Sequence, residues 1–293
     1  MRIVILGASG LIGHKLLQQF QTRFDEVHGV LHGSAERFAH LDFMKRAPPH
    51  ENIQGEDFDQ VSHVLDTVKP DAVLNCLGIT KRRPEVNDPL RAVAVNSLLP
   101  HRLGAWARQN GSRVIHFSTD CVFDGTEGNY TEGSVTTARD AYGQTKALGE
   151  TRDDHNLTIR SSFIGRELAV HSELLDWFLK QNGKSIKGYS RAMYTGISTL
   201  EMARIIGDIV EKHTDLSGLY QLSMAEPIDK YSLLLLFRDA FGLDVEIEPD
   251  DTVAIDARLD GSRLRSEIGY ELPEWRDMVQ AIAADPTPYP TLS

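Results

Sequence analysis

The sequence predicts an α/β fold in which a doubly wound parallel sheet is followed by a smaller C-terminal lobe. Three observations predict this fold. An apolar run at the N-terminus leads into a glycine-rich segment, apolar runs then alternate with amphipathic stretches, and this alternation stops after about residue 162. Such alternation is typical of parallel strands whose connecting helices cover both faces of a sheet.

The elements follow from these patterns in chain order. Apolar runs predict strands at 2–6, 27–31, 72–76, 114–118 and 157–160. Helical patterns predict a helix at 59–69, ended by Pro70, and a longer one at 89–109, closed by Asn110-Gly111. Later patterns predict helices at 173–181, 199–212 and 231–241 and strands at 218–222 and 245–247. We therefore expect a first domain over 1–161 and a second lobe over 162–293, some segments of which return to the sheet.

Composition narrows the classes of partner. The chain of 293 residues carries a net charge of −11, which argues against broad contact with the phosphates of nucleic acid. Two cysteines, Cys76 and Cys121, are too few for a disulfide framework or a zinc site, and no metal is expected. The sequence shows no signal segment and no long apolar span, so we expect a cytoplasmic protein without a membrane partner.

The glycine-rich segment predicts a dinucleotide site. It follows the run Ile3–Leu6 and opens a predicted helix. Glycines permit a tight turn, the approach of backbone N–H groups to a pyrophosphate, and close packing of helix on strand. The partial positive charge of the helix N-terminus favours phosphate. The residues expected to contact the dinucleotide here are Gly7, Ser9, Gly10, Leu11, Ile12 and Gly13.

A second cluster pairs a phenol with an amine. Tyr142 and Lys146 are four residues apart, so on a helix they share one face. An ammonium beside the phenol would lower its pKa toward working pH and let it pass a proton to a carbonyl oxygen. The alternative is a packed ring beside a solvated amine.

A third cluster follows the strand predicted at 114–118. Thr119 comes at the carboxyl end of that strand, where ligands bind in open parallel sheets. Its hydroxyl is expected to hydrogen-bond a substrate carbonyl, with Asp120 and Cys121 beside it in the substrate site. The alternative is a polar turn that caps a loop.

Together these clusters resemble the extended short-chain dehydrogenase/reductase family, whose cofactor domain is a Rossmann fold. The resemblance covers essentially the whole chain. Segments 118–125 and 142–150 most resemble dTDP-4-dehydrorhamnose reductases and related nucleotide-sugar reductases. Further matching residues are Asp57-Phe58, Asn75-Cys76-Leu77-Gly78, Asn96, Asp260–Leu264 and Gly269-Tyr270.

The resemblance implies a role for each matching residue. Tyr142 would be the general acid, Lys146 would bind the nicotinamide ribose, and Thr119 would orient the keto group that receives hydride. Asp57 and Phe58 would flank the adenine, and Cys76, Leu77 and Gly78 would line the cofactor. Asn96 would support the site from a neighbouring helix, or would be a buried amide that satisfies backbone groups.

The loop after the second strand bears on cofactor choice. An acid there would bind the adenosine ribose and repel a 2′-phosphate, but this loop carries His32, Ser34 and Arg37 instead. These residues offer donors and positive charge, so we expect NADPH, with NADH as the alternative. Arg37 as a solvated surface residue is the other interpretation.

Cys121 departs from the reductase pattern. Sugar 4,6-dehydratases carry Asp-Glu after the catalytic threonine, so dehydration is disfavoured here. GDP-fucose synthases, which are epimerase-reductases, carry a proton-transferring cysteine at the corresponding place. Their partner histidine is not evident, because Arg166-Glu167 follows Ile164-Gly165. Cys121 is therefore either a proton-transfer group or an inert buried thiol.

The second lobe supplies candidate partners for the substrate's phosphates. Arginine offers a fork suited to phosphate oxygens, and Arg166, Arg191 and Arg258 are the candidates, each of which is alternatively a solvated surface charge. The cluster Lys81-Arg82-Arg83 either touches phosphate or solvates a loop.

Three functions remain open at this point. The first is NADPH-dependent reduction of a 4-keto-6-deoxy nucleotide sugar for polysaccharide precursors. The second is epimerisation, alone or with reduction, using bound NAD(P) and Cys121. The third is a non-catalytic NADP-binding regulator, because a chain resembling these reductases serves as the regulatory subunit of methionine adenosyltransferase. Family likeness also favours a homodimer.

Overall fold

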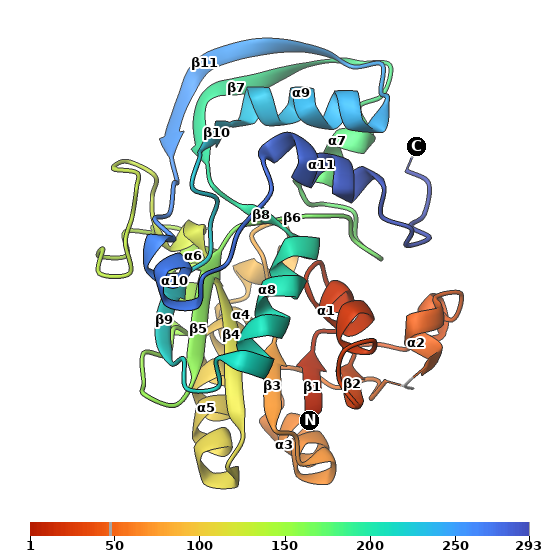
Figure 1. The fold of residues 1–293 in the computed structure, drawn as a ribbon, viewed down its shortest axis with the longest axis vertical. Coiled ribbons are helices and arrows are strands. Elements are labelled where there is room, and N and C mark those ends of the chain that lie inside the picture. Colours follow the sequence, from red (N-terminus) through yellow and green to blue (C-terminus); the bar gives the residue numbers. More distant parts are fainter. Residues whose placement is uncertain (47–48, 293) are drawn as a thin grey trace.

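The central sheet of the computed structural model, which describes residues 1–46 and 49–292, has six parallel strands. Their order is β2-β1-β3-β4-β5-β9. This order confirms the predicted doubly wound α/β fold, because the chain runs outward from β1 in both directions (Figure 1). The strands are β1 (Arg2–Leu6), β2 (Glu26–Val30), β3 (Ala72–Asn75), β4 (Arg113–Thr119), β5 (Leu157–Ser161) and β9 (Gly218–Gln221).

Helices cover both faces of this sheet. Alternate residues of β1 divide between two cores: Ile3 and Ile5 pack with α1 (Gly13–Phe20) and α8 (Thr199–Lys212), and Val4 and Leu6 with α3 (Phe58–Val68) and α5 (Leu99–Asn110). Burial on both faces explains why the strands are continuous apolar runs.

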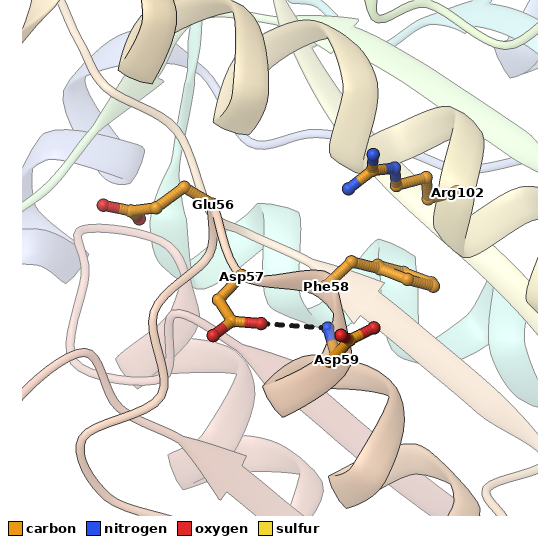
Figure 2. A pocket seen from close by; sticks show the side chains of 5 residues that line it. All are labelled: Glu56, Asp57, Phe58, Asp59 and Arg102. Atoms are coloured by element: carbon orange, nitrogen blue, oxygen red, sulfur yellow. Dashed lines mark hydrogen bonds between the residues drawn. The ribbon is translucent and has the colours of Figure 1, made fainter.

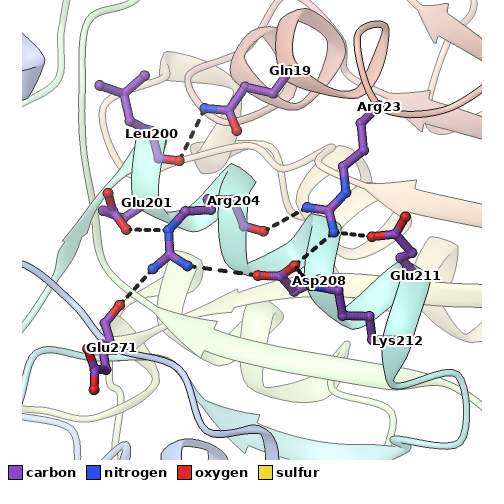
Figure 3. Close-up of polar contacts among 9 residues, drawn as sticks. All are labelled: Gln19, Arg23, Leu200, Glu201, Arg204, Asp208, Glu211, Lys212 and Glu271. Atoms are coloured by element: carbon purple, nitrogen blue, oxygen red, sulfur yellow. Dashed lines mark hydrogen bonds and ion pairs between the residues drawn. The ribbon is translucent and has the colours of Figure 1, made fainter.

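Helix α8 ties the second half of the chain to the first. Its Asp208 and Glu211 pair with Arg23, just after α1, at 2.8 and 2.5 Å (Figure 3). Gln19 of α1 donates to the carbonyl of Leu200 at 3.2 Å, and Arg204 donates to the carbonyl of Glu271 at 2.6 Å. Together with β9 at the sheet edge, α8 shows that segments beyond residue 162 return to the sheet.

The helix predicted at 89–109 is interrupted. It consists of α4 (Pro89–Val93), a π-helical turn over Ala94–Leu98, and α5, closed by Gly111 with φ +65°. A π-turn inserts one residue into the helical repeat, which spacing of apolar residues does not reveal. The turn lies against the end of α6 (Ala141–Leu148), and it carries the buried side chain of Asn96.

Several strands and helices of the second half of the chain form a lobe beyond the carboxyl ends of the sheet strands (Figure 1). A three-stranded sheet of order β10-β7-β11 packs on α7, α9 and α11 around Phe178 and Phe237. Its elements are α7 (Leu174–Leu179), β7 (Ser185–Tyr194), β10 (Ile228–Asp229), α9 (Lys230–Phe241), β11 (Glu246–Asp256) and α11 (Trp275–Ala283). The remaining elements are α2 (Asp42–Arg46), α10 (Ser262–Ile268), the parallel pair β6 (Phe163–Ile164) and β8 (Ile197–Ser198), and 3₁₀ turns at Glu36–Phe38, Pro84–Asn87 and Asp120–Val122.

Two absences hold for the described residues. None of their helices combines the length and the apolar character needed to cross a bilayer. Within the same residues, no group of three or more histidine, cysteine or acidic side chains is placed to hold a metal ion.

Candidate active site

The glycine-rich segment forms a tight turn between β1 and α1. Gly7 has φ +78°, and the N–H of Gly10 donates to its carbonyl at 2.9 Å. A Cβ on Gly13 would lie 2.2 Å from the carbonyl oxygen of Gly7, so no side chain fits there. The turn leaves Ser9, Gly10, Leu11 and Ile12 accessible above the start of α1. This cradle fits a pyrophosphate held by backbone N–H groups.

Gly13→Ala tests this cradle. The added Cβ forces the turn to shift, so we expect the variant to bind NADPH at least about tenfold more weakly, a loss of about 1.4 kcal/mol or more. Quenching of protein fluorescence by the dinucleotide measures the affinity. Gly133→Ala is the matched control, because a Cβ there meets nothing closer than 3.8 Å. Equal affinities for both variants would contradict the cradle.

Thr119 and Tyr142 meet at the carboxyl end of β4. The Thr119 hydroxyl accepts from the N–H of Cys121 and donates to a carboxylate oxygen of Asp120, both at 3.1 Å. Hydrogen bonding to Thr119 lowers the pKa of Tyr142, but burial, the larger effect, raises it above its ordinary value. Asp140 fixes the start of α6 by accepting from the N–H of Gly143 at 2.7 Å. The topology thus brings together two clusters that are 23 positions apart.

Lys146 lies behind this pair, and here one prediction was wrong. Its amine donates to the carbonyl of Phe117 at 2.6 Å and lies 3.3 Å from Nε2 of His116. Burial lowers the pKa of Lys146 to about 8. The expected lowering of the Tyr142 pKa by Lys146 is absent, because the amine contacts β4 and burial governs the phenol.

Polar residues that the sequence analysis missed form a layer between the sheet and α6. Glu150 holds Arg160 with two hydrogen bonds of 2.7 Å, and the Ser118 hydroxyl donates to Glu150 at 2.8 Å. Neither charged side chain is more than 2% exposed. On the other side of Lys146, Asn75 contacts His116 at 3.1 Å. The sequence feature that could have revealed this polar layer is the presence of His116 and Arg160 within otherwise apolar strands.

Asn96 fits both interpretations given above, as a support of the site and as a buried amide that satisfies backbone groups. Its amide donates to the carbonyl of Ile79 at 3.0 Å and to the Thr145 hydroxyl at 3.1 Å, and its oxygen accepts from the N–H of Ile79 at 2.8 Å. It is a satisfied buried amide that also pins the loop after β3 to α6. Cys76, Leu77 and Gly78, the predicted cofactor-lining residues, lie just before this contact.

The predicted adenine neighbours border a cavity of about 480 Å³ (Figure 2). Asp57 turns toward α3 and accepts from the N–H groups of Asp59 and Gln60 as an N-cap. Phe58 lies beneath Arg102, with the guanidinium 5.8 Å from the ring centre. The Asp57 carboxylate is therefore engaged in capping, which leaves the ring of Phe58 and the backbone for a base.

The predicted 2′-phosphate loop is shaped by local contacts. Ser34 accepts from the N–H of Glu36 at 3.1 Å, and the carbonyl of His32 accepts from Gln54 at 3.2 Å. The Arg37 guanidinium lies 5.2 Å from the ring centre of Phe38. All three predicted residues are exposed, near the carboxyl end of β2.

Two of the three predicted phosphate-binding arginines already face carboxylates. Arg166 donates to Asp176 at 2.6 Å, and Arg258 makes two hydrogen bonds with Asp256 at 2.7 and 2.6 Å. Arg191 is exposed on β7. Arg166 and Arg258 therefore already use part of their hydrogen-bonding capacity on carboxylates of the same chain.

Two lysines, Lys81 and Lys230, lie near the segment Thr119–Cys121. Lys81 lies 3.5 Å from the sulfur of Cys121, and burial raises the pKa of that thiol to about 12. Lys230, at the start of α9, was missed; burial lowers its pKa, and the charge of Asp120 opposes this shift. Cations from two parts of the chain therefore lie near the segment Thr119–Cys121.

Comparison with known families agrees with this geometry. Residues 1–287 match the family described as the RmlD substrate binding domain. The chain belongs to the RmlD family. This confirms the resemblance to the extended short-chain dehydrogenase/reductases.

Among curated proteins, this RmlD-family chain is similar to methionine adenosyltransferase 2 subunit beta from Rattus norvegicus. The two are 31% identical over 257 residues, which is 83% of this chain and 72% of the rat protein. Among solved structures, it is similar to a hypothetical dTDP-4-dehydrorhamnose reductase from Sulfolobus tokodaii, 25% identical, with a TM-score of 0.76 over 93% of this chain and 98% of that one.

Two further solved structures share the fold. The dTDP-4-dehydrorhamnose reductase from Bacillus anthracis, solved with NADP, is 17% identical, with a TM-score of 0.75 over 96% of this chain and 98% of that one. Bordetella bronchiseptica WbmG, solved with NAD and UDP, is 18% identical, with a TM-score of 0.79 over 97% of this chain and 93% of that one.

Proposed function

We propose that this protein reduces the keto group of a nucleotide-activated 4-keto-6-deoxy sugar with NADPH, for the synthesis of polysaccharide precursors. The carrying observation is the meeting of Thr119 and Tyr142 at the carboxyl end of β4, with Lys146 behind them. The glycine cradle beside this site fits a dinucleotide, and its tight turn requires glycine at position 13, where a Cβ would collide with the carbonyl of Gly7. Membership of the RmlD family supports a nucleotide sugar as substrate.

The residues divide the chemistry between them. The bound nicotinamide supplies a hydride, which carries two electrons, to the carbonyl carbon. Thr119 donates a hydrogen bond to the carbonyl oxygen and holds the ketone in place, and Tyr142 gives its phenolic proton to that oxygen. Burial raises the pKa of Tyr142, so the phenol enters the reaction protonated, as a general acid must. Lys146 would bind the ribose hydroxyls of the dinucleotide.

The cofactor preference rests on the loop after β2. His32, Ser34 and Arg37 bring donors and positive charge to the place where a 2′-phosphate would bind, and the loop lacks the acid that would repel it. The solved relatives hold NADP in one case and NAD in another. We expect tighter binding of NADPH than of NADH.

Absorbance of the reduced nicotinamide tests the proposal. The protein is mixed with NADPH or NADH and a panel of dTDP-, GDP- and UDP-linked 4-keto-6-deoxy sugars. We expect oxidation of NADPH with at least one of them, and slower oxidation of NADH. No oxidation across the panel, by a protein that binds the dinucleotide, would refute the proposal.

A regulatory role is the second candidate, and the likeness to methionine adenosyltransferase 2 subunit beta favours it. A non-catalytic regulator would bind NADP(H) and a methionine adenosyltransferase catalytic subunit without oxidising NADPH. Co-elution with that subunit in gel filtration, together with inactivity across the panel, would support this role.

Epimerisation through Cys121 has weaker support. A cysteine moves a proton as its thiolate, and burial raises the pKa of Cys121 to about 12, although Lys81 lies 3.5 Å from the sulfur. If Cys121 does transfer protons, Cys121→Ser abolishes exchange of substrate hydrogen with deuterated solvent and spares dinucleotide binding. Without epimerisation, the wild-type protein itself shows no such exchange.

A further inference from the structure

His116 is a fully buried titratable residue to which the proposed reaction gives no role. It lies in the middle of β4, and its imidazole stands between two side chains. Nδ1 lies 3.1 Å from the amide nitrogen of Asn75, and Nε2 lies 3.3 Å from the amine of Lys146. The ring therefore contacts the lysine of the candidate site directly from β4.

The neighbours of the ring determine where its proton sits. The side-chain oxygen of Asn75 accepts from the N–H of Leu77 at 3.3 Å, so the amide turns its N–H toward Nδ1 of His116. Nδ1 then accepts a hydrogen bond. Burial lowers the pKa of His116 well below its ordinary value, so the ring is neutral and carries its single proton on Nε2. That N–H faces Lys146.

This arrangement has a consequence for the lysine. An ammonium has three donors and no lone pair, whereas a neutral amine has a lone pair that accepts a hydrogen bond. The amine also donates to the carbonyl of Phe117 at 2.6 Å, which both forms are able to do. Facing a donor on His116, only the neutral amine satisfies both contacts.

We propose that His116 is a positioning residue that favours the neutral, hydrogen-accepting form of the Lys146 amine in the ligand-free protein, so that a proton enters at Lys146 when a dinucleotide binds. The incoming proton comes from solvent, and the ribose hydroxyls then accept hydrogen bonds from the new ammonium. This step rests on the ribose contact of the proposed function. A lysine that gains and loses a proton near neutral pH is suited to restore the proton that Tyr142 gives up.

Other groups near Lys146 also shift its pKa, and with it the ratio of neutral amine to ammonium. Glu150, at the end of the same helix, raises the pKa of Lys146, and the thiol of Cys76 adds a smaller rise. Burial, the largest effect, lowers that pKa to about 8. Glu150 is itself held by Arg160 and Ser118. The linkage through Asn75 to Leu77 connects the state of Lys146 to the loop predicted to line the cofactor.

The first test needs no ligand. Nitrogen-15 NMR of histidine-labelled protein reports which ring nitrogen carries the proton. We expect His116 as the neutral Nε2–H form at pH 9, where Lys146 is mainly neutral, and Asn75→Asp to switch it to the Nδ1–H form, because a carboxylate accepts from Nδ1. The backbone carbonyl of Asn75 also favours a proton on the ring. A wild-type ring protonated at Nδ1, or at both nitrogens, would overturn the proposal.

The second test measures proton uptake on binding NADPH. Calorimetry at pH 8 in two buffers of different ionisation enthalpy should show uptake of about half a proton, because a group with a pKa of about 8 is half protonated there. In His116→Gln the amide oxygen accepts from the ammonium, so uptake should fall to about a fifth of the wild-type value or less. Asn75→Asp should do the same if His116→Gln does not fold.

The control is His155→Gln, which replaces a half-buried histidine whose Nε2 contacts the carbonyl of Ser112 at 2.7 Å. Its proton uptake should match the wild type. Unchanged uptake in a folded His116→Gln or Asn75→Asp protein would overturn the proposal. A protein that binds no dinucleotide would refute the proposed function, and the NMR result would then decide the role of His116 alone.

Discussion

Tyr142→Phe is expected to lower kcat for ketone reduction about 1000-fold, within the range that general acids contribute, and to leave NADPH affinity within about twofold. The variant keeps the ring and removes only the proton that reaches the carbonyl oxygen. Stopped-flow absorbance of NADPH with a reactive keto nucleotide sugar measures the rate, and fluorescence titration measures the affinity.

Tyr194→Phe makes this test specific. Tyr194 is a second buried phenol whose pKa burial raises, and it too is influenced by the charge of Asp120. We expect this variant to keep the hydride-transfer rate within about tenfold of the wild type, because its hydroxyl interacts with Ser162 and not with Thr119. A large loss in Tyr194→Phe combined with full activity in Tyr142→Phe would move the general acid to the other ring.

Glu150→Ala is expected to lower the free energy of unfolding by about 3–5 kcal/mol. The substitution leaves the guanidinium of Arg160 buried without its carboxylate, at 0% exposure. It also removes the acceptor of the Ser118 hydroxyl, next to Thr119. Urea unfolding followed by circular dichroism measures the change.

Two further variants distinguish the stability effect of the buried Glu150–Arg160 pair from that of a surface charge. Arg152 also reaches Glu150, at 3.5 Å, but its side chain is 53% exposed, so Arg152→Ala should cost less than about 1 kcal/mol. The double variant Glu150→Leu with Arg160→Met should be more stable than Glu150→Ala, because it leaves no unpaired buried charge. A loss below about 1 kcal/mol for Glu150→Ala would show that the pair is not a structural anchor.

The strands of the central sheet could be predicted from the sequence because they are buried on both faces and therefore appear as continuous apolar runs. Each of the five strands predicted in the first half is observed to within two residues at either end. The position of Thr119 at the carboxyl end of a strand was also accessible, whereas its meeting with Tyr142, which lies on a helix, was expected only from the family resemblance. The family motifs then added the roles of these residues.

The partners of polar side chains could not be predicted. The sequence shows Arg166 and Arg258 as cations but does not show that Asp176 and Asp256 face them. It placed Lys146 beside Tyr142 by helical spacing, whereas the long side chain reaches across to Phe117 and His116. Periodicity gives the face of a helix, and the direction of a flexible side chain depends on tertiary partners.

The most direct test of the central claim is the transfer of deuterium from NADPH labelled at the hydride-donating position of the nicotinamide ring. The claim is that Thr119, Tyr142 and Lys146 form a carbonyl-reducing site beside a bound dinucleotide. Mass spectrometry of the nucleotide-sugar product should find one deuterium on carbon in the wild type, and no labelled product above background in Tyr142→Phe. An unlabelled substrate pool after prolonged incubation with wild-type protein saturated in NADPH would contradict the claim.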